Sequence, residues 1–172
     1  MGLKDLFCKK NEDDDPSMPN YPGAFLMQHV AFRGMIGGAG IGAGVGLVSC
    51  MLGRTKFRRA LLFPGHGMQI GATVAIATVL GFSIIKEDFD EEGVKDRAFR
   101  LSYKHKQNIL DRRTMIGLGG GAALGLLPFF ALDKVPIIVR VGTGMSYGIL
   151  ATSLAFLAES KLQTNPVKES NE

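Results

Sequence analysis

Residues 34–53 read GMIGGAGIGAGVGLVSCMLG, a run of twenty residues without a charge between Arg33 and Arg54. A helix rises about 1.5 Å per residue, so this run would span about 30 Å, which matches the hydrocarbon core of a bilayer. A water-soluble helix would lose roughly 1 kcal/mol for each glycine relative to alanine, whereas membrane helices use glycine to approach one another closely. The run therefore predicts a transmembrane helix.

Three further stretches are also apolar and nearly free of charge, with Arg140 as their one charged residue. Charged residues make up 21% of the chain, yet they fall into blocks between these stretches. A soluble protein would mix charge into every surface element, so the segregation indicates lipid as the solvent of the apolar stretches. We predict an all-α membrane protein with four glycine-rich transmembrane helices at about 34–53, 65–85, 114–132 and 137–158.

Polar segments surround these spans. Residues 1–28 and 159–172 are predicted to be tails on either side of a membrane domain at 29–158. Between spans two and three, Phe99, Tyr103, Lys106 and Leu110 recur at helical spacing. This pattern favours an amphipathic helix at about 94–110, lying at the membrane surface, although a solvated linker is the alternative.

Glycines recur at steps of four within every predicted span. Such a stripe leaves one face of a helix without side chains, so that a second helix can lie directly against it, either in this protein or in a neighbour. The predicted helix-packing residues are Gly34, Gly38, Gly42, Gly46, Gly67, Gly71, Gly117, Gly121, Gly125, Gly144 and Gly148.

The sequence offers no recognisable catalytic or cofactor site. The glycines around Gly38 loosely fit a dinucleotide fingerprint, but no strand precedes them and no phosphate-binding Gly-Lys-Ser/Thr motif occurs. His29, His66 and His105 are far apart from one another and from the two cysteines, so no metal spacing is present. We expect neither a cofactor nor a metal, and not an enzyme.

A basic loop follows the first span. Its bases are Arg54, Lys56, Arg58 and Arg59, and the chain carries a net charge of +4. Because these bases flank apolar runs and are not interleaved with exposed aromatics, we expect anionic lipid such as cardiolipin, and no nucleic acid, as their partner. The alternative is that the loop acts only as a topology signal.

The four glycine-striped spans, the short basic loop and the longer middle loop together resemble the PRAT family of mitochondrial inner-membrane preprotein and amino-acid transporters. Asp111 precedes Gly120, Gly121 and Gly125 as in the family signature, although Gln107 stands where the family has arginine. The first residues also lack the acid-free character of a cleavable transit peptide, so we expect internal targeting signals. The resemblance implies a multi-pass protein of the mitochondrial inner membrane.

That family includes channel-like subunits of protein translocases and a B14.7-type accessory subunit of respiratory complex I. Apart from Arg140, the spans contain few polar residues that could line a pore. We therefore expect a non-catalytic subunit that braces other membrane subunits of a complex I-like respiratory assembly. A translocase subunit and an accessory subunit of the ATP synthase are the alternatives. The orientation is open, because the count of basic residues and the resemblance favour opposite sides for the termini.

Overall fold

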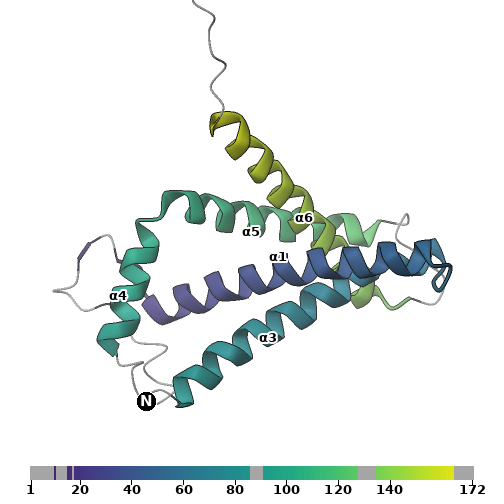
Figure 1. The fold of residues 1–172 in the computed structure, drawn as a ribbon. Coiled ribbons are helices and arrows are strands. Elements are labelled where there is room, and N and C mark those ends of the chain that lie inside the picture. The colour runs from purple at the N-terminus through teal and green to yellow at the C-terminus, as the bar shows by residue number, and fades with distance from the viewer. Residues whose placement is uncertain (1–9, 11–14, 17, 86–90, 128–134, 165–172) are drawn as a thin grey trace, which may run out of the picture.

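The computed structural model describes residues 10, 15, 16, 18–85, 91–127 and 135–164, and in these ranges every regular element is a helix. Figure 1 shows the arrangement. In chain order the helices are α1 (Pro22–Met51), α2 (Phe57–Ala60), α3 (Phe63–Ile85), α4 (Glu91–Ser102), α5 (His105–Leu126) and α6 (Ile137–Thr164).

Among the described residues, three stretches of helix are long and apolar enough to cross a membrane, as in a multi-pass membrane protein. They are Pro22–Met51, Phe57–Gly81 and Ile137–Lys161. The fourth long helix, α5, begins with the polar turns HKQNILDRR, and its apolar part is described only as far as Leu127. The end of the predicted span at 114–132 thus lies outside the described residues.

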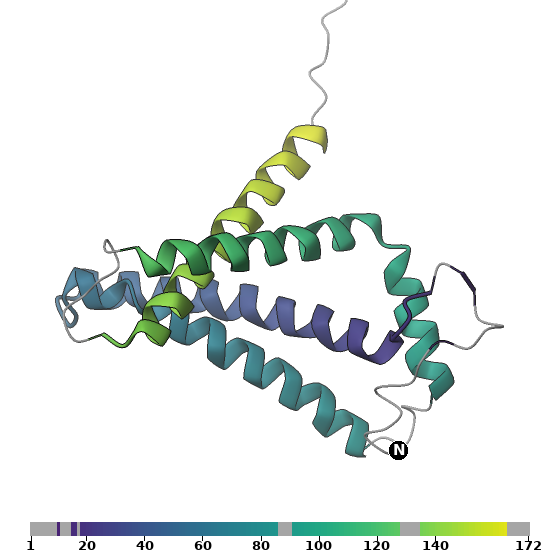
Figure 2. The same cartoon turned by 180° about the vertical axis from the view of Figure 1, so that it is seen from behind.

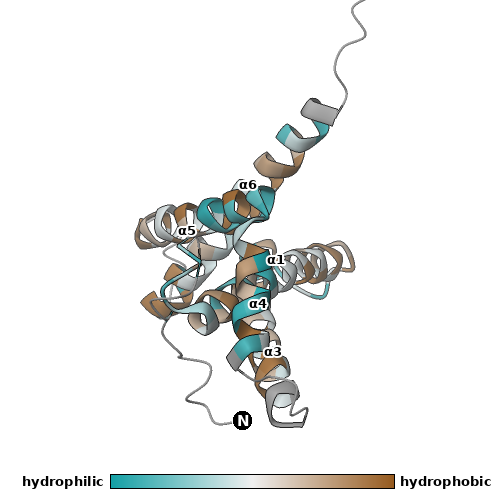
Figure 3. Ribbon diagram, turned by 90° about the vertical axis from the view of Figure 1, so that its left-hand side faces the viewer, coloured by the Kyte–Doolittle hydropathy of each residue, from teal (hydrophilic) through white to brown (hydrophobic). Residues whose placement is uncertain are grey.

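The long helices form two antiparallel pairs, α1 with α3 and α5 with α6 (Figures 1 and 2). The start of α1, the end of α3, α4 and the start of α5 lie at one end of the molecule, which we call the α4 end. The loop after α1, α2, the end of α5 and the start of α6 lie at the opposite end, called the loop end. Figure 3, viewed toward the α4 end, shows hydrophilic residues on α4 and the adjacent part of α1.

Two helices extend beyond the predicted boundaries. The predicted tail ended at residue 28, but α1 begins at Pro22, whose ring fixes φ in the helical range and whose missing N–H is not needed in the first turn. Helix α6 continues past residue 158 to Thr164. Backbone hydrogen bonds do not depend on side-chain polarity, so both helices run on through residues that the hydropathy pattern assigned to the tails.

The predicted amphipathic helix at 94–110 is not continuous. The chain leaves the helix after Ser102, and α5 starts at His105. Ser102 Oγ donates to the Phe99 carbonyl and Asn108 Nδ2 donates to the Ser102 carbonyl, local bonds that compete with the helical ladder. The apolar face of α4 is buried at Val94, Ala98 and Leu101, and α4 packs against α1. Protein therefore covers the face that we had expected to meet the membrane surface.

Candidate functional site

The contact between α1 and α3 is made by backbone. A Cβ atom added at Gly38 would collide with the Gly67 carbonyl, and one added at Gly67 would collide with the Gly38 carbonyl. The same relation joins Gly34 to Gly71. Further along α1, Gly42 faces the Phe63 carbonyl, and a Cβ on Gly46 would lie 2.8 Å from the Ala60 carbonyl oxygen. From Gly34 to Gly42, each step of four along α1 therefore meets a step of four along α3 in the reverse direction, and Gly46 contacts the end of α2.

The pair α5 and α6 repeats this construction. Gly117 faces Gly148, and Gly121 faces Gly144, with each added Cβ colliding with the opposite backbone. At the loop end, a Cβ on Gly125 would lie 2.6 Å from the Arg140 carbonyl oxygen. All of the glycines singled out for helix packing thus lie in contacts inside this chain, where the sequence had left open a contact with a neighbour.

A second set of glycines has open space around it. No atom lies within 4 Å of a Cβ built at Gly37, Gly40 or Gly44 on α1, or at Gly119 or Gly120 on α5. An outward groove of about 670 Å³ runs along α1 and α3. Gly37 lines it, and Ile41, Val45, Ile70 and Val74 are among its apolar side chains. These helices therefore keep an apolar outer face after the internal packing is complete.

The two helix pairs meet through α3 and α6. A Cβ on Gly65 would lie 2.9 Å from Thr143 Oγ1, and the Tyr147 hydroxyl donates a 3.1 Å hydrogen bond to the Leu61 carbonyl. Nearby, Ala39, Met68 and Ile149 form a buried apolar cluster. The sequence analysis did not single out these contacts, since neither Gly65 nor Tyr147 belongs to a four-step stripe.

A charged cluster joins α1 to α5 at the α4 end. His29 Nδ1 lies 2.6 Å from Asp111 Oδ2, and Arg33 Nη2 donates to Asp111 Oδ1 at 3.2 Å. The His29 and Asp111 side chains are 13% and 14% exposed, whereas Arg33 is 34% exposed. Sequence reasoning used Asp111 only for the family resemblance and found no partner for it, because its partners lie about 80 positions earlier.

A second ion pair joins α5 to α6 close to this cluster. Arg113 Nη2 donates to Glu159 Oε2 at 2.5 Å, and the guanidinium carbon lies 5.6 Å from the centre of the Phe156 ring. The hydrogen bond to Glu159 raises the pKa of Arg113 above its ordinary value. The charged cluster joins α1 to α5, and the Arg113–Glu159 pair joins α5 to α6. Ionic contacts therefore connect these helices near the ends of their apolar stretches.

The predicted lipid-binding bases occupy the loop end. Arg54, Lys56, Arg58 and Arg59 are all exposed, on the turn after α1 and on α2. Arg140, the charged residue within the predicted fourth span, is only partly exposed, and its Nε atom is buried without a hydrogen-bond partner in the described structure.

Within the described ranges, no group of three or more His, Cys, Asp or Glu side chains could hold a metal ion. No family model, no curated protein and no solved structure matches this chain. The case for function therefore depends on the helix contacts, the charged α4 end and the outer apolar faces.

Proposed function

We propose that this protein is a non-catalytic membrane subunit that braces neighbouring subunits of a multi-subunit assembly in the mitochondrial inner membrane, complex I-like in kind. The observation that carries the proposal is the backbone-to-backbone packing of both helix pairs. Helices in such close contact have little freedom to separate, so they make a stiff scaffold, and stiffness suits a brace.

The outer faces support the same role. Gly37, Gly40 and Gly44 leave a second smooth face on α1 beside the apolar groove. Lipid tails are as apolar as leucine, so a neighbouring subunit gains most from close contact area, which small residues provide. A transmembrane helix of a partner is the occupant that this proposal assigns to the face.

A translocase subunit is the second candidate. A conduit needs polar groups along its path, and closely packed glycine backbones leave no space for them between the paired helices. The buried polar residues Thr114, Thr143 and Ser146 each donate to a carbonyl of their own helix, and so do not point to a polar path. The ATP synthase alternative differs only in the partner and shares every argument for a brace.

The first test is the set of proteins that co-migrate with the tagged chain on a native gel of mild-detergent mitochondrial membranes. We expect subunits of one respiratory complex. Depletion should weaken that complex while precursor import stays normal at first. Early failure of import with intact respiratory complexes would instead favour the translocase and contradict the brace.

A paired set of variants tests the outer face. The double variant Gly37→Leu, Gly44→Leu places side chains only into open space, so the isolated protein should unfold at the parent's temperature but co-migrate poorly with its partners. The matched control is Gly119→Leu on the outer face of α5, which should keep its partners if α1 carries the contact. If the double variant co-migrates with its partners as well as the parent does, the outer face of α1 is not the surface that binds them.

A further inference from the structure

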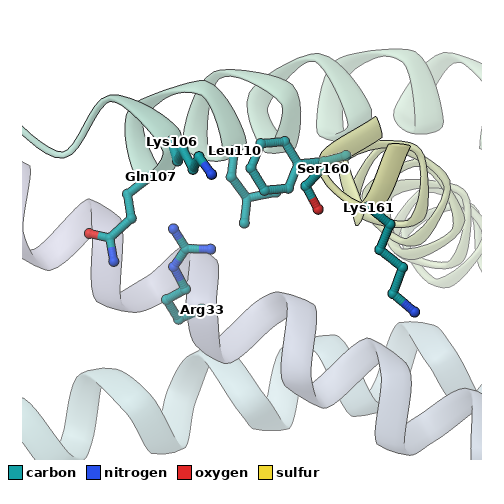
Figure 4. A pocket seen from close by; sticks show the side chains of 7 residues that line it. Arg33, Lys106, Gln107, Leu110, Ser160 and Lys161 are labelled. Atoms are coloured by element: carbon teal, nitrogen blue, oxygen red, sulfur yellow. The ribbon is translucent and has the colours of Figure 1, made fainter. Parts of the chain in front are cut away.

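A cavity of about 790 Å³ opens at the α4 end between three helices (Figure 4). Its charged lining residues are Arg33 from α1, Lys106 from α5 and Lys161 from α6, and none of the described residues that line it is acidic. Leu110 and Phe156 supply an apolar wall. The cavity thus combines three cations with a hydrophobic surface, which sequence reasoning could not foresee because the residues come from three distant segments.

Acidic side chains among the described residues neutralise the positive charge of this cavity only in part. Asp111, next to Arg33, is already shared between Arg33 and His29, and Glu159 is paired with Arg113. Lys106 and Lys161 are exposed and make no ion pair within the described part of the chain.

The cavity lies where the apolar parts of the helices end, and this position favours an amphipathic ligand. Arg33 immediately precedes the uncharged stretch of α1, and Lys161 follows the apolar stretch of α6, so both cations lie where the apolar parts of the helices end. This level corresponds to the headgroup region of a bilayer. Basic pockets between membrane helices at this depth suit phosphate headgroups, and the apolar wall suits the acyl chains below them.

We propose that this cavity binds the headgroup of an anionic phospholipid, with Arg33, Lys106 and Lys161 facing the phosphate and with Leu110 and Phe156 beside the lipid chain. The site lies at the opposite end of the molecule from the basic loop, which sequence reasoning chose as the lipid site. It does not depend on the proposed bracing role.

The test uses the full chain purified in mild detergent and titrated with phosphatidylglycerol or with zwitterionic phosphatidylcholine, with bound lipid counted by native mass spectrometry. The variant is Lys106→Gln with Lys161→Gln. Each base near an anionic headgroup changes affinity about fivefold, so the variant should bind phosphatidylglycerol about 30-fold more weakly than the parent. Both lysines are exposed, so the unfolding temperature without lipid should not change. Arg33 is left intact because it also holds Asp111.

The matched control is Arg97→Gln with Arg100→Gln, which removes the same charge from the exposed face of α4 and should bind phosphatidylglycerol like the parent. If the control loses as much affinity as the cavity variant, diffuse attraction explains binding and the site is rejected. The proposal also fails if the cavity variant binds like the parent, or if inorganic phosphate displaces the lipid at similar concentrations, since the cavity would then take a free anion.

Discussion

At the scale of single residues, neighbouring glycines in α1 have opposite surroundings. A Cβ atom on Gly38 would enter the backbone of α3, whereas one on Gly37 would meet nothing within 4 Å. Both residues share the same helix, the same depth and the same intrinsic helix propensity. The difference in stability between the same substitution at Gly38 and at Gly37 therefore measures the helix contact alone, because the change in helix propensity is the same at both positions.

Gly38→Leu should accordingly destabilise the protein by about 3 kcal/mol or more, because a side chain must force two backbones apart. Gly37→Leu should leave stability unchanged or raise it slightly, since leucine is the better helix former. Thermal unfolding in mild detergent compares the two. Equal losses for both would show that the four-step stripe does not pack against α3.

Asp111 is the other residue whose environment is unusual, because one carboxylate accepts from both His29 and Arg33. Asp111→Asn should cost about 2 kcal/mol, below the usual loss for a fully buried pair because Arg33 is partly exposed to solvent. The control is Asp96→Asn, whose pair with Arg100 has both partners mainly exposed, and this change should cost less than about 0.5 kcal/mol. Similar losses in chemical or thermal unfolding would mean that the cluster adds nothing to the joint between α1 and α5.

At the scale of elements, each helix pair is an antiparallel hairpin whose register is set by matched steps of four. Gly34, Gly38 and Gly42 of α1 face Gly71, Gly67 and Phe63 of α3 in that order, so the residue numbers rise along one helix as they fall along the other. A shift by one residue would bring side chains into the contact, so the register has little freedom. Helix α6 makes a second contact, beside its glycines. Thr143 packs against α3, and Tyr147 donates a hydrogen bond to the turn that precedes α3.

Tyr147→Phe tests this second contact of α6. The change removes the hydrogen bond to the Leu61 carbonyl and keeps the ring, so we expect a loss of about 1 kcal/mol in stability. Tyr21→Phe is the control, since Tyr21 is 54% exposed and should be neutral. An unfolding temperature for Tyr147→Phe equal to that of the control would mean that the bond does not tie α6 to the α2–α3 turn.

At the scale of the whole molecule, two hairpins are joined by a small apolar cluster in the middle and by charge at the α4 end. Ala39, Met68 and Ile149 come from three helices and are nearly or fully buried. In lipid such a cluster stabilises the protein mainly through van der Waals contact. Its apolar groups are surrounded by lipid before they pack, so packing displaces no water from them. A substitution that shortens a side chain in this cluster should therefore weaken the contact between the two hairpins.

Ile149→Ala should cost about 2 kcal/mol, at the low end for such substitutions because the transfer from water contributes little within a membrane. Ile138→Ala, at a position 73% exposed on the same helix, should be nearly neutral. The free energy of unfolding in mixed micelles distinguishes them. A loss for Ile138→Ala as large as that for Ile149→Ala would mean that burial in this cluster is not what matters.

Sequence alone was sufficient for the helical class, for the approximate positions of three of the four predicted membrane-spanning stretches and for the glycines that lie in the helix contacts. These features follow from local periodicity, since composition decides the solvent of a helix and spacing decides which residues share a face. Helix ends were less certain, as the early start of α1 and the break after Ser102 show, because local hydrogen bonds outweighed the hydropathy pattern there.

Only the tertiary structure decided which faces meet. It paired α1 with α3 and α5 with α6, placed His29 and Arg33 on Asp111, and gathered Arg33, Lys106 and Lys161 around one cavity. Four-step glycines look alike on every helix, so spacing cannot say which stripe lies against which. Ion pairs between distant segments depend on the chain folding back at matching depths, and a one-dimensional pattern does not contain that distance.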